Sequence, residues 1–429
     1  MNRFCQPGEH VSRRSFMKGL LATSGGAAVA NWGSLTNSQT IAAELQKTGK
    51  RCIMIWLGGG ASQLDTFDMK IGHANGGPFR PIQSSLPGLE VCEYMPNIAP
   101  LAHQLCVIRG MSTGDPGHPS GTHLMHCGRR NEGIVEYPEI GSVVAKYLGK
   151  PEDSSLPSFI QFATGGQSGP NSGSGFLGPK FQPFRMSTDR APEYTTGYLK
   201  PEEEQRRREL FQFVQDQFTE DRHADSYQAY QEAKESAWRL MDVRQIFNLD
   251  KEWAKAKELY GDTEFGKRCL LARRFVEEGV PFVEIDNGGG GWDTHGENFD
   301  GHKRLIPPMD KGWAGLLVDL EQRGLLEDTL VIWQGEFGRT PNINNRIGRD
   351  HYARAWTTVL AGGGVKAGYV HGKTSEDGRT VVDGLVSTGD YFATVFQALG
   401  INPRDMNYVG IRPVPVAPDH SKVIQELLA

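Results

Sequence analysis

The chain has 429 residues, of which 38% are hydrophobic, and its 46 basic and 51 acidic residues give a formal net charge of −5. A chain of this length can bury the core of one large domain or of two ordinary ones. The near-balance of charge excludes a general attraction to nucleic acid or to an anionic membrane, so any ligand has to be bound by a local site.

The N-terminal segment is predicted to be a targeting signal that lies outside the fold. Arg13 and Arg14 form a twin-arginine pair, the mildly apolar GLLATSGGAAVA follows, and its final Ala-Val-Ala suits a signal peptidase. We therefore expect residues 1–30 to be a signal peptide that the twin-arginine (Tat) translocon reads, with the folded protein in the periplasm or otherwise exported. No later segment approaches the roughly 18 uninterrupted apolar residues of a membrane anchor, so no stable anchor is expected.

Residues 31–429 alternate short apolar runs with helical patterns, which is typical of a mostly parallel α/β sheet covered on both faces. Six runs are predicted to be strands, at residues 52–57, 105–110, 156–162, 280–286, 329–334 and 356–364. From about 201 to 278 the sequence is rich in charge, with apolar residues at helical spacing, which predicts a helical insertion packed beside the sheet. Residues 168–184 are rich in Gly, Ser and Pro and are expected to form a surface loop, with a flexible lid as the alternative.

Carboxylates and histidines recur just after the predicted strands, where ligands of parallel α/β sheets collect. The candidate metal ligands at these positions are Asp65, Asp293, His295, Glu336 and His351. Carboxylate combined with neutral imidazole favours zinc or manganese over calcium or magnesium, which prefer oxygen ligands. The glycines at 58–60 lack the third glycine of a dinucleotide fingerprint, so the sequence predicts a divalent metal and no nucleotide cofactor.

Three longer motifs carry a resemblance to a known family: WDTHGENF (292–299), GEFGRTPNINNRIGRDH (335–351) and VLAGGGVKAGYVHGKTSEDG (359–378). They are similar to the exported family called domain of unknown function 1501, in the alkaline phosphatase superfamily. The resemblance covers most of residues 52–403. It implies an α/β/α sandwich of alkaline phosphatase type that hydrolyses phosphate or sulfate esters at two metals, with the five candidate ligands matching ligand positions. Glu336-Phe337 stands where the superfamily has Asp-His, so a single metal remains an alternative.

The resemblance places a nucleophile near the start of the helix in RGMSTGDPGHPSGTHLMHCGRR (109–130), at the position of His118. A formylglycine-type C-x-P-S-R pattern is absent there, so His118 is left as a metal ligand, a phosphoryl acceptor or a general acid. Arg339 follows Glu336 closely enough to hold an anionic ester oxygen, with a structural ion pair as the alternative. We therefore expect an exported metal-dependent hydrolase acting on a small-molecule or glycan anionic ester. The alternative is a non-catalytic exported binding protein on the same scaffold.

Overall fold

One nine-stranded sheet organises the fold, and a computed structural model describes residues 49–131, 133–149, 156–162, 173–186, 200–219, 234 and 244–429. The strands of this sheet are β1 (Arg51–Trp56), β4 (Leu105–Ser112), β5 (Phe159–Phe162), β6 (Phe184–Met186), β7 (Phe282–Asp286), β8 (Thr329–Gln334), β11 (Trp356–Gly362), β12 (Tyr369–His371) and β15 (Val386–Ser387). Their order is β12-β4-β11-β8-β1-β7-β5-β6, with β15 also paired to β4. Only β11 is antiparallel to its neighbours in this sheet. The predicted mostly parallel α/β fold is confirmed.

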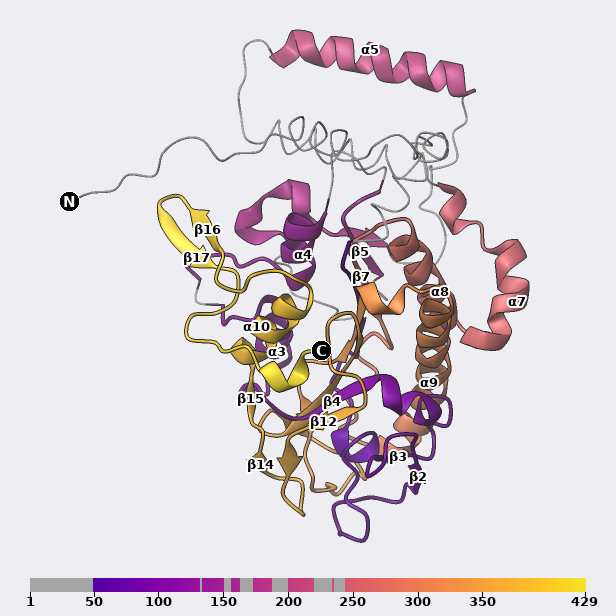
Figure 1. Cartoon of the computed structure of the whole chain (residues 1–429), viewed down its shortest axis with the longest axis vertical. Helices are drawn as coiled ribbons and strands as arrows, with labels where there is room; N and C mark the ends of the chain where they lie inside the picture. Colours follow the sequence, from indigo (N-terminus) through magenta and orange to yellow (C-terminus); the bar gives the residue numbers. More distant parts are fainter. Residues whose placement is uncertain are drawn as a thin grey trace, which may run out of the picture. The chain divides into compact units, whose positions relative to one another are not determined.

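Helices cover both faces of the sheet, as Figure 1 shows. The helices of this layered unit are α3 (His118–Cys127), α4 (Ile140–Leu148), α7 (Asp250–Tyr260), α8 (Glu264–Glu277), α9 (Asn298–Gln322) and α10 (Thr388–Ala398). In β1, Ile53 and Ile55 pack in a core with α8 and α9, whereas Met54 and Trp56 pack in a second core with α3, α4 and α10. Because successive side chains of a strand point to opposite faces, a continuous apolar run is what such a doubly covered strand requires.

The carboxyl ends of four central strands meet at one edge of the sheet. β1 pairs in parallel with β7 and with β8. β4 is antiparallel to β11, which is antiparallel to β8, so β4 also runs in the direction of β8. The segments after these four strands therefore emerge side by side, and they carry most of the candidate site residues.

The described part of the region predicted as a helical insertion contains α5 (Pro201–Thr219), a 3-10 turn at Arg244–Phe247, α7 and α8. α8 contributes Phe275 and Val276 to the core on its face of the sheet. Short two-stranded pairs complete the fold: β2 (Pro81–Gln83) with β3 (Glu90–Cys92), β9 (Gly338–Arg339) with β10 (His351–Tyr352), β13 (Lys373–Thr374) with β14 (Val381–Asp383), and β16 (Met406–Val409) with β17 (Arg412–Pro415).

Three sequence predictions lie wholly or partly outside the described residues, and one of them is the helical insertion at 201–278, which is described at 201–219, 234 and 244–278. The signal peptide at 1–30 lies outside them entirely, and the loop at 168–184 is described only from residue 173. That described part contains two 3-10 turns, at Gly175–Leu177 and Pro179–Phe181. Across the described ranges, no helix has the length and apolar character needed to cross a membrane.

Candidate metal centre

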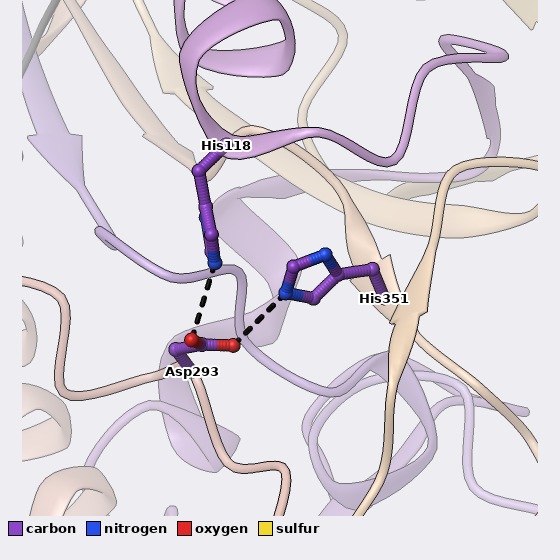
Figure 2. A group of neighbouring side chains, drawn as sticks. All are labelled: His118, Asp293 and His351. Atoms are coloured by element: carbon purple, nitrogen blue, oxygen red, sulfur yellow. Dashed lines mark hydrogen bonds and ion pairs between the residues drawn. The ribbon is translucent and has the colours of Figure 1, made fainter.

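Three histidines from separate segments surround one carboxylate at the carboxyl edge of the sheet. His118 is the first residue of α3, after β4, and His351 is the first residue of β10. Asp293 and His295 lie in the glycine-rich segment between β7 and α9. We call His118, Asp293, His295 and His351 the His/Asp cluster. Figure 2 shows His118 and His351 approaching Asp293 from different directions.

Asp293 is the centre of the His/Asp cluster. Its Oδ2 lies 3.2 Å from Nε2 of His118. Its Oδ1 lies 3.2 Å from Nε2 of His295 and 3.1 Å from Nε2 of His351. The Nε2 atoms of His295 and His351 are themselves 2.9 Å apart. All three imidazoles therefore present the same nitrogen, Nε2, to the carboxylate.

The opposite nitrogen of each ring is held by a hydrogen-bond acceptor. Nδ1 of His351 is 2.7 Å from the carbonyl oxygen of Pro116. A carbonyl oxygen can only accept, so this Nδ1 carries a proton. Nδ1 of His295 is 2.7 Å from Oδ1 of Asp350. The hydrogen bond from His295 lowers the pKa of Asp350, so the carboxylate is the acceptor here too.

His118 follows the same pattern through Glu336. Nδ1 of His118 is 2.8 Å from Oε1 of Glu336, and the backbone N–H of Gly59 donates to the same oxygen at 2.9 Å. The side-chain hydrogen bond to Glu336 raises the pKa of His118. Glu336 is 2% exposed, and its Oε2 has no hydrogen-bond partner among the described residues. Glu336, predicted as a direct metal ligand, therefore lies behind His118 in this structure.

This arrangement fits a divalent cation. In neutral histidines with protonated Nδ1 atoms, each Nε2 offers a lone pair, so the cluster directs three lone pairs and a carboxylate at one another. Two Nε2 lone pairs at 2.9 Å require a proton or a cation between them. Ligand atoms about 2.0–2.1 Å from a tetrahedral metal lie roughly 3.3 Å apart, close to the spacing found here. The ligand atoms of His118, Asp293 and His351 all lie within 4.8 Å of one another.

Arg339 is buried beside Asp293 and forms an ion pair with it. Its side chain has no exposed surface, and Nη2 lies 2.6 Å from Oδ1 of Asp293. Its other N–H groups donate to the backbone carbonyls of Gly59, Gly60 and Arg349. Burial alone raises the pKa of Asp293, but its contact with His351 and the charge of Arg339 outweigh it and hold that pKa well below its usual range. Arg339 thus orients an ionised Asp293 and has little capacity left for a ligand.

The glycine turn after β1 makes this close assembly possible. Gly59 has φ of +104°, and a Cβ there would lie 2.3 Å from the backbone nitrogen of Asp293. Gly60 has φ of +81°, and a Cβ there would lie 2.4 Å from the carbonyl oxygen of Phe337. Positive φ and such close approach both favour glycine. These two glycines therefore allow the loops that carry Asp293 and Glu336 to pack closely against the turn after β1.

Two of the five predicted ligands, Asp65 and Glu336, are not members of the His/Asp cluster, and among the described residues Asp65 has no hydrogen bond or ion pair with it. Asp65 is fully buried and accepts hydrogen bonds from Arg349, with Nε at 2.8 Å, and from Nδ2 of Asn298 at 2.9 Å. Two contributors to the centre were not predicted as site residues. Asp350 could have been found because it precedes His351 in the same motif, whereas the carbonyl of Pro116 has no side-chain signal in the sequence.

Comparison with known proteins gives one family match. The sequence profile of a family described as "Protein of unknown function (DUF1501)" matches residues 49–428. Among curated proteins, none has a matching sequence.

Solved structures provide a weaker likeness. A sulfatase from Pseudoalteromonas sp. is 13% identical with a TM-score of 0.39, the match covering 84% of this chain and 70% of that one. A phosphonate monoester hydrolase from Silicibacter pomeroyi is 9% identical with a TM-score of 0.38, covering 88% and 76%. A lipoteichoic acid synthase from Listeria monocytogenes is 9% identical with a TM-score of 0.35, covering 88% and 80%. At these scores the likeness supports no inference about activity.

Proposed function

We propose that this chain, which belongs to the family described as protein of unknown function (DUF1501), binds a divalent metal in the His/Asp cluster and hydrolyses phosphate or sulfate esters there. One observation carries the metal part of this proposal. Three imidazoles whose Nδ1 atoms are each held by an acceptor direct their Nε2 atoms at a single carboxylate. Metal-binding histidines typically have such an acceptor on the other ring nitrogen.

The donor set favours zinc or manganese. Three imidazole nitrogens with one carboxylate oxygen suit a borderline metal, whereas calcium and magnesium prefer sites built from oxygen. We propose one metal for each chain. Asp65, which matched a ligand position in the sequence, accepts hydrogen bonds from Arg349 and Asn298 instead.

The ester-hydrolase part rests on the motif resemblance and on the chemistry available at the cluster. A divalent metal there supplies a Lewis acid that polarises an ester oxygen and activates water. Within the described residues, the side chains that form hydrogen bonds or ion pairs with Asp293 are three imidazoles and the Arg339 guanidinium, and none of them carries a hydroxyl. We therefore propose water as the nucleophile. Glu336 holds Nδ1 of His118, and Arg339 orients Asp293.

Metal content tests the first part. We expect purified wild-type protein to contain close to one zinc or manganese per chain by elemental analysis. His351→Ala and Asp293→Asn should each lose most of this metal, because removing one ligand from a small ligand set removes a large share of the binding energy. Glu336→Gln should weaken metal affinity by a smaller factor, about 10- to 100-fold, because it acts through His118.

Two other histidines serve as controls. His371, in β12, and His420 lie outside the His/Asp cluster, so His371→Ala and His420→Ala should keep wild-type metal content. Equal metal content in all variants, with folding verified by circular dichroism, would refute the metal centre. Release of p-nitrophenol from p-nitrophenyl phosphate or sulfate tests the second part. A metal-loaded wild type that hydrolyses neither ester would favour the non-catalytic binding protein.

We also propose that the protein is exported in folded form by the Tat translocon to the periplasm or beyond. This proposal rests on the pair Arg13-Arg14 and the apolar segment that follows. Export of an already folded chain suits a protein whose metal ligands come from distant segments, because those ligands meet only after folding.

A further inference from the structure

A surface cavity of about 410 Å³ adjoins the His/Asp cluster. We call it the arginine cavity. The six lining residues used in the argument below are Asn342, Asn344, Asp350, Tyr352, Arg354 and Arg379. Asp350 belongs to the cavity wall and also holds Nδ1 of His295 at 2.7 Å. Tyr352 directly follows His351 in β10. The cavity wall therefore contains a residue that contacts His295 and a residue that directly follows His351 in the sequence.

One acidic residue, Asp350, lines the arginine cavity, and its Oδ1 accepts hydrogen bonds. Oδ1 of Asp350 accepts from His295 and, at 3.2 Å, from Nδ2 of Asn344. Asn344 also donates to the carbonyl of His295 at 3.0 Å. These hydrogen bonds hold Oδ1 of Asp350 toward His295, and the cavity wall carries two arginines against this one carboxylate.

Two basic residues, Arg354 and Arg379, also line the cavity. Arg354 is exposed, and within the described ranges its guanidinium has no hydrogen bond or ion pair. Arg379 is held in place, with Nη2 2.6 Å from Oδ1 of Asn342 and Nε 3.4 Å from Asp377. The hydroxyl of Tyr352 donates to the carbonyl of Arg379 at 2.5 Å. One arginine is thus fixed and the other free, on a wall that also offers amide and phenol groups.

We propose that the arginine cavity binds a second anionic group of the substrate, separate from the ester that reacts at the His/Asp cluster. Guanidinium groups form paired hydrogen bonds with sulfate, phosphate and carboxylate oxygens. A cavity of this size accommodates one group of a small ligand or one sugar unit. The substrate class that follows is an ester bearing at least two anionic groups, such as a multiply sulfated or phosphorylated saccharide. This inference extends the proposed function, but binding in the cavity can be tested without turnover.

Calorimetric titration with sucrose octasulfate, at fixed ionic strength, tests the inference on the full-length protein. We expect Arg354→Ala to weaken binding about tenfold or more, because hydrogen bonds to a charged partner are lost. Arg354→Lys keeps the charge and should keep part of the affinity. Arg412→Ala, which removes an exposed arginine that does not line the cavity, should bind as wild type does. Neutral sucrose should not bind measurably.

The outcomes separate this inference from the metal proposal. His351→Ala should retain most of the affinity for sucrose octasulfate, since the arginine cavity does not require the metal. If wild type contains no metal while binding still depends on Arg354, the proposed function fails and the cavity inference stands. Equal affinity of wild type and Arg354→Ala, or equal binding of sucrose and its octasulfate, would overturn the cavity inference.

Discussion

The side chains of Asp65 and Arg349 form an ion pair with no exposed surface. Asn298 donates to Asp65 as well, and Arg349 also donates to the carbonyls of Asn75, Thr340 and Pro341. A guanidinium therefore supplies the positive charge that the buried carboxylate needs. In this arrangement Asp65 connects the segment after β1 with the loop before β10, and it stabilises the surroundings of the His/Asp cluster.

Two substitutions distinguish this structural role from metal binding. Arg349→Met should lower the free energy of unfolding by about 3–5 kcal/mol, because it leaves the buried charge of Asp65 uncompensated. Asp65→Asn should leave the metal content of the folded protein at the wild-type level. Urea denaturation and elemental analysis measure the two effects, with Asp293→Asn as the variant that loses metal. Loss of metal in Asp65→Asn would restore Asp65 to the ligand set.

At the scale of elements, the buried His126 links α3 to β7. Nδ1 of His126 donates to the carbonyl of Thr122 at 2.9 Å, and Nε2 lies 3.3 Å from Oε1 of Glu284 in β7. Since both partners are acceptors, the ring carries two protons and is charged. Burial lowers the pKa of His126, but the charge of Glu284 outweighs it, and the result is a pKa of about 9. This ion pair joins the helix that begins at His118 to the strand that precedes Asp293.

The ion pair predicts how stability depends on pH. The folded-state pKa of His126 lies above its ordinary value of 6.5, so the stabilisation is complete below about pH 6.5 and is lost as pH rises through about 9. The loss should be about 3 kcal/mol. Urea denaturation of wild type and Glu284→Gln between pH 7 and 10 measures it, because groups common to both proteins cancel in the difference.

We expect the stability gap between wild type and Glu284→Gln to shrink as pH rises. Glu139 also interacts with His126, and burial raises the pKa of Glu139 to about 7, so its titration is centred at the low-pH end of this window and is complete before His126 titrates. A constant gap across the range would show that His126 is uncharged at pH 7.

The elements differ in how far the sequence could predict them. The six predicted strands all occur in the sheet, because a strand buried on both faces must be a continuous apolar run. β6, β12 and β15 were not predicted, since strands of two or three residues have no measurable periodicity. The antiparallel direction of β11 was not predicted either, because apolar content says nothing about strand direction.

The same limit applies to the site. Position after a strand correctly indicated which loops meet, and Asp293, His295 and His351 do lie together. It could not indicate which way each side chain points, so Asp65 and Glu336 have other partners than the sequence implied, whereas Arg339 forms an ion pair, the alternative to binding an ester oxygen. The arginine cavity depends on how residues 340–354 fold back toward Arg379, a contact that no motif encodes.

At the scale of the whole molecule, the chain divides into two units, and the described fold lies in the second. The division falls between Thr48 and Gly49, and the described fold begins at residue 49. The residues of the His/Asp cluster span positions 118–351, so the cluster is complete only when this stretch of the second unit has folded. A pathway that carries folded proteins is therefore compatible with loading the metal before export.

The twin-arginine proposal yields the last prediction. Changing Arg13 and Arg14 together to lysine should retain the protein in the cytoplasm, because the translocon reads the arginine pair and not positive charge alone. The substitution keeps the net charge of the leader and lies outside the described fold, so metal content and stability should not change. Cell fractionation with immunoblotting measures the distribution, and Arg3→Lys, which alters an arginine of the leader outside the pair, is the matched control. The control should be exported as wild type is. If the double lysine variant is exported equally well, the leader is read by another pathway, and folding before export is no longer required to explain how the metal is acquired.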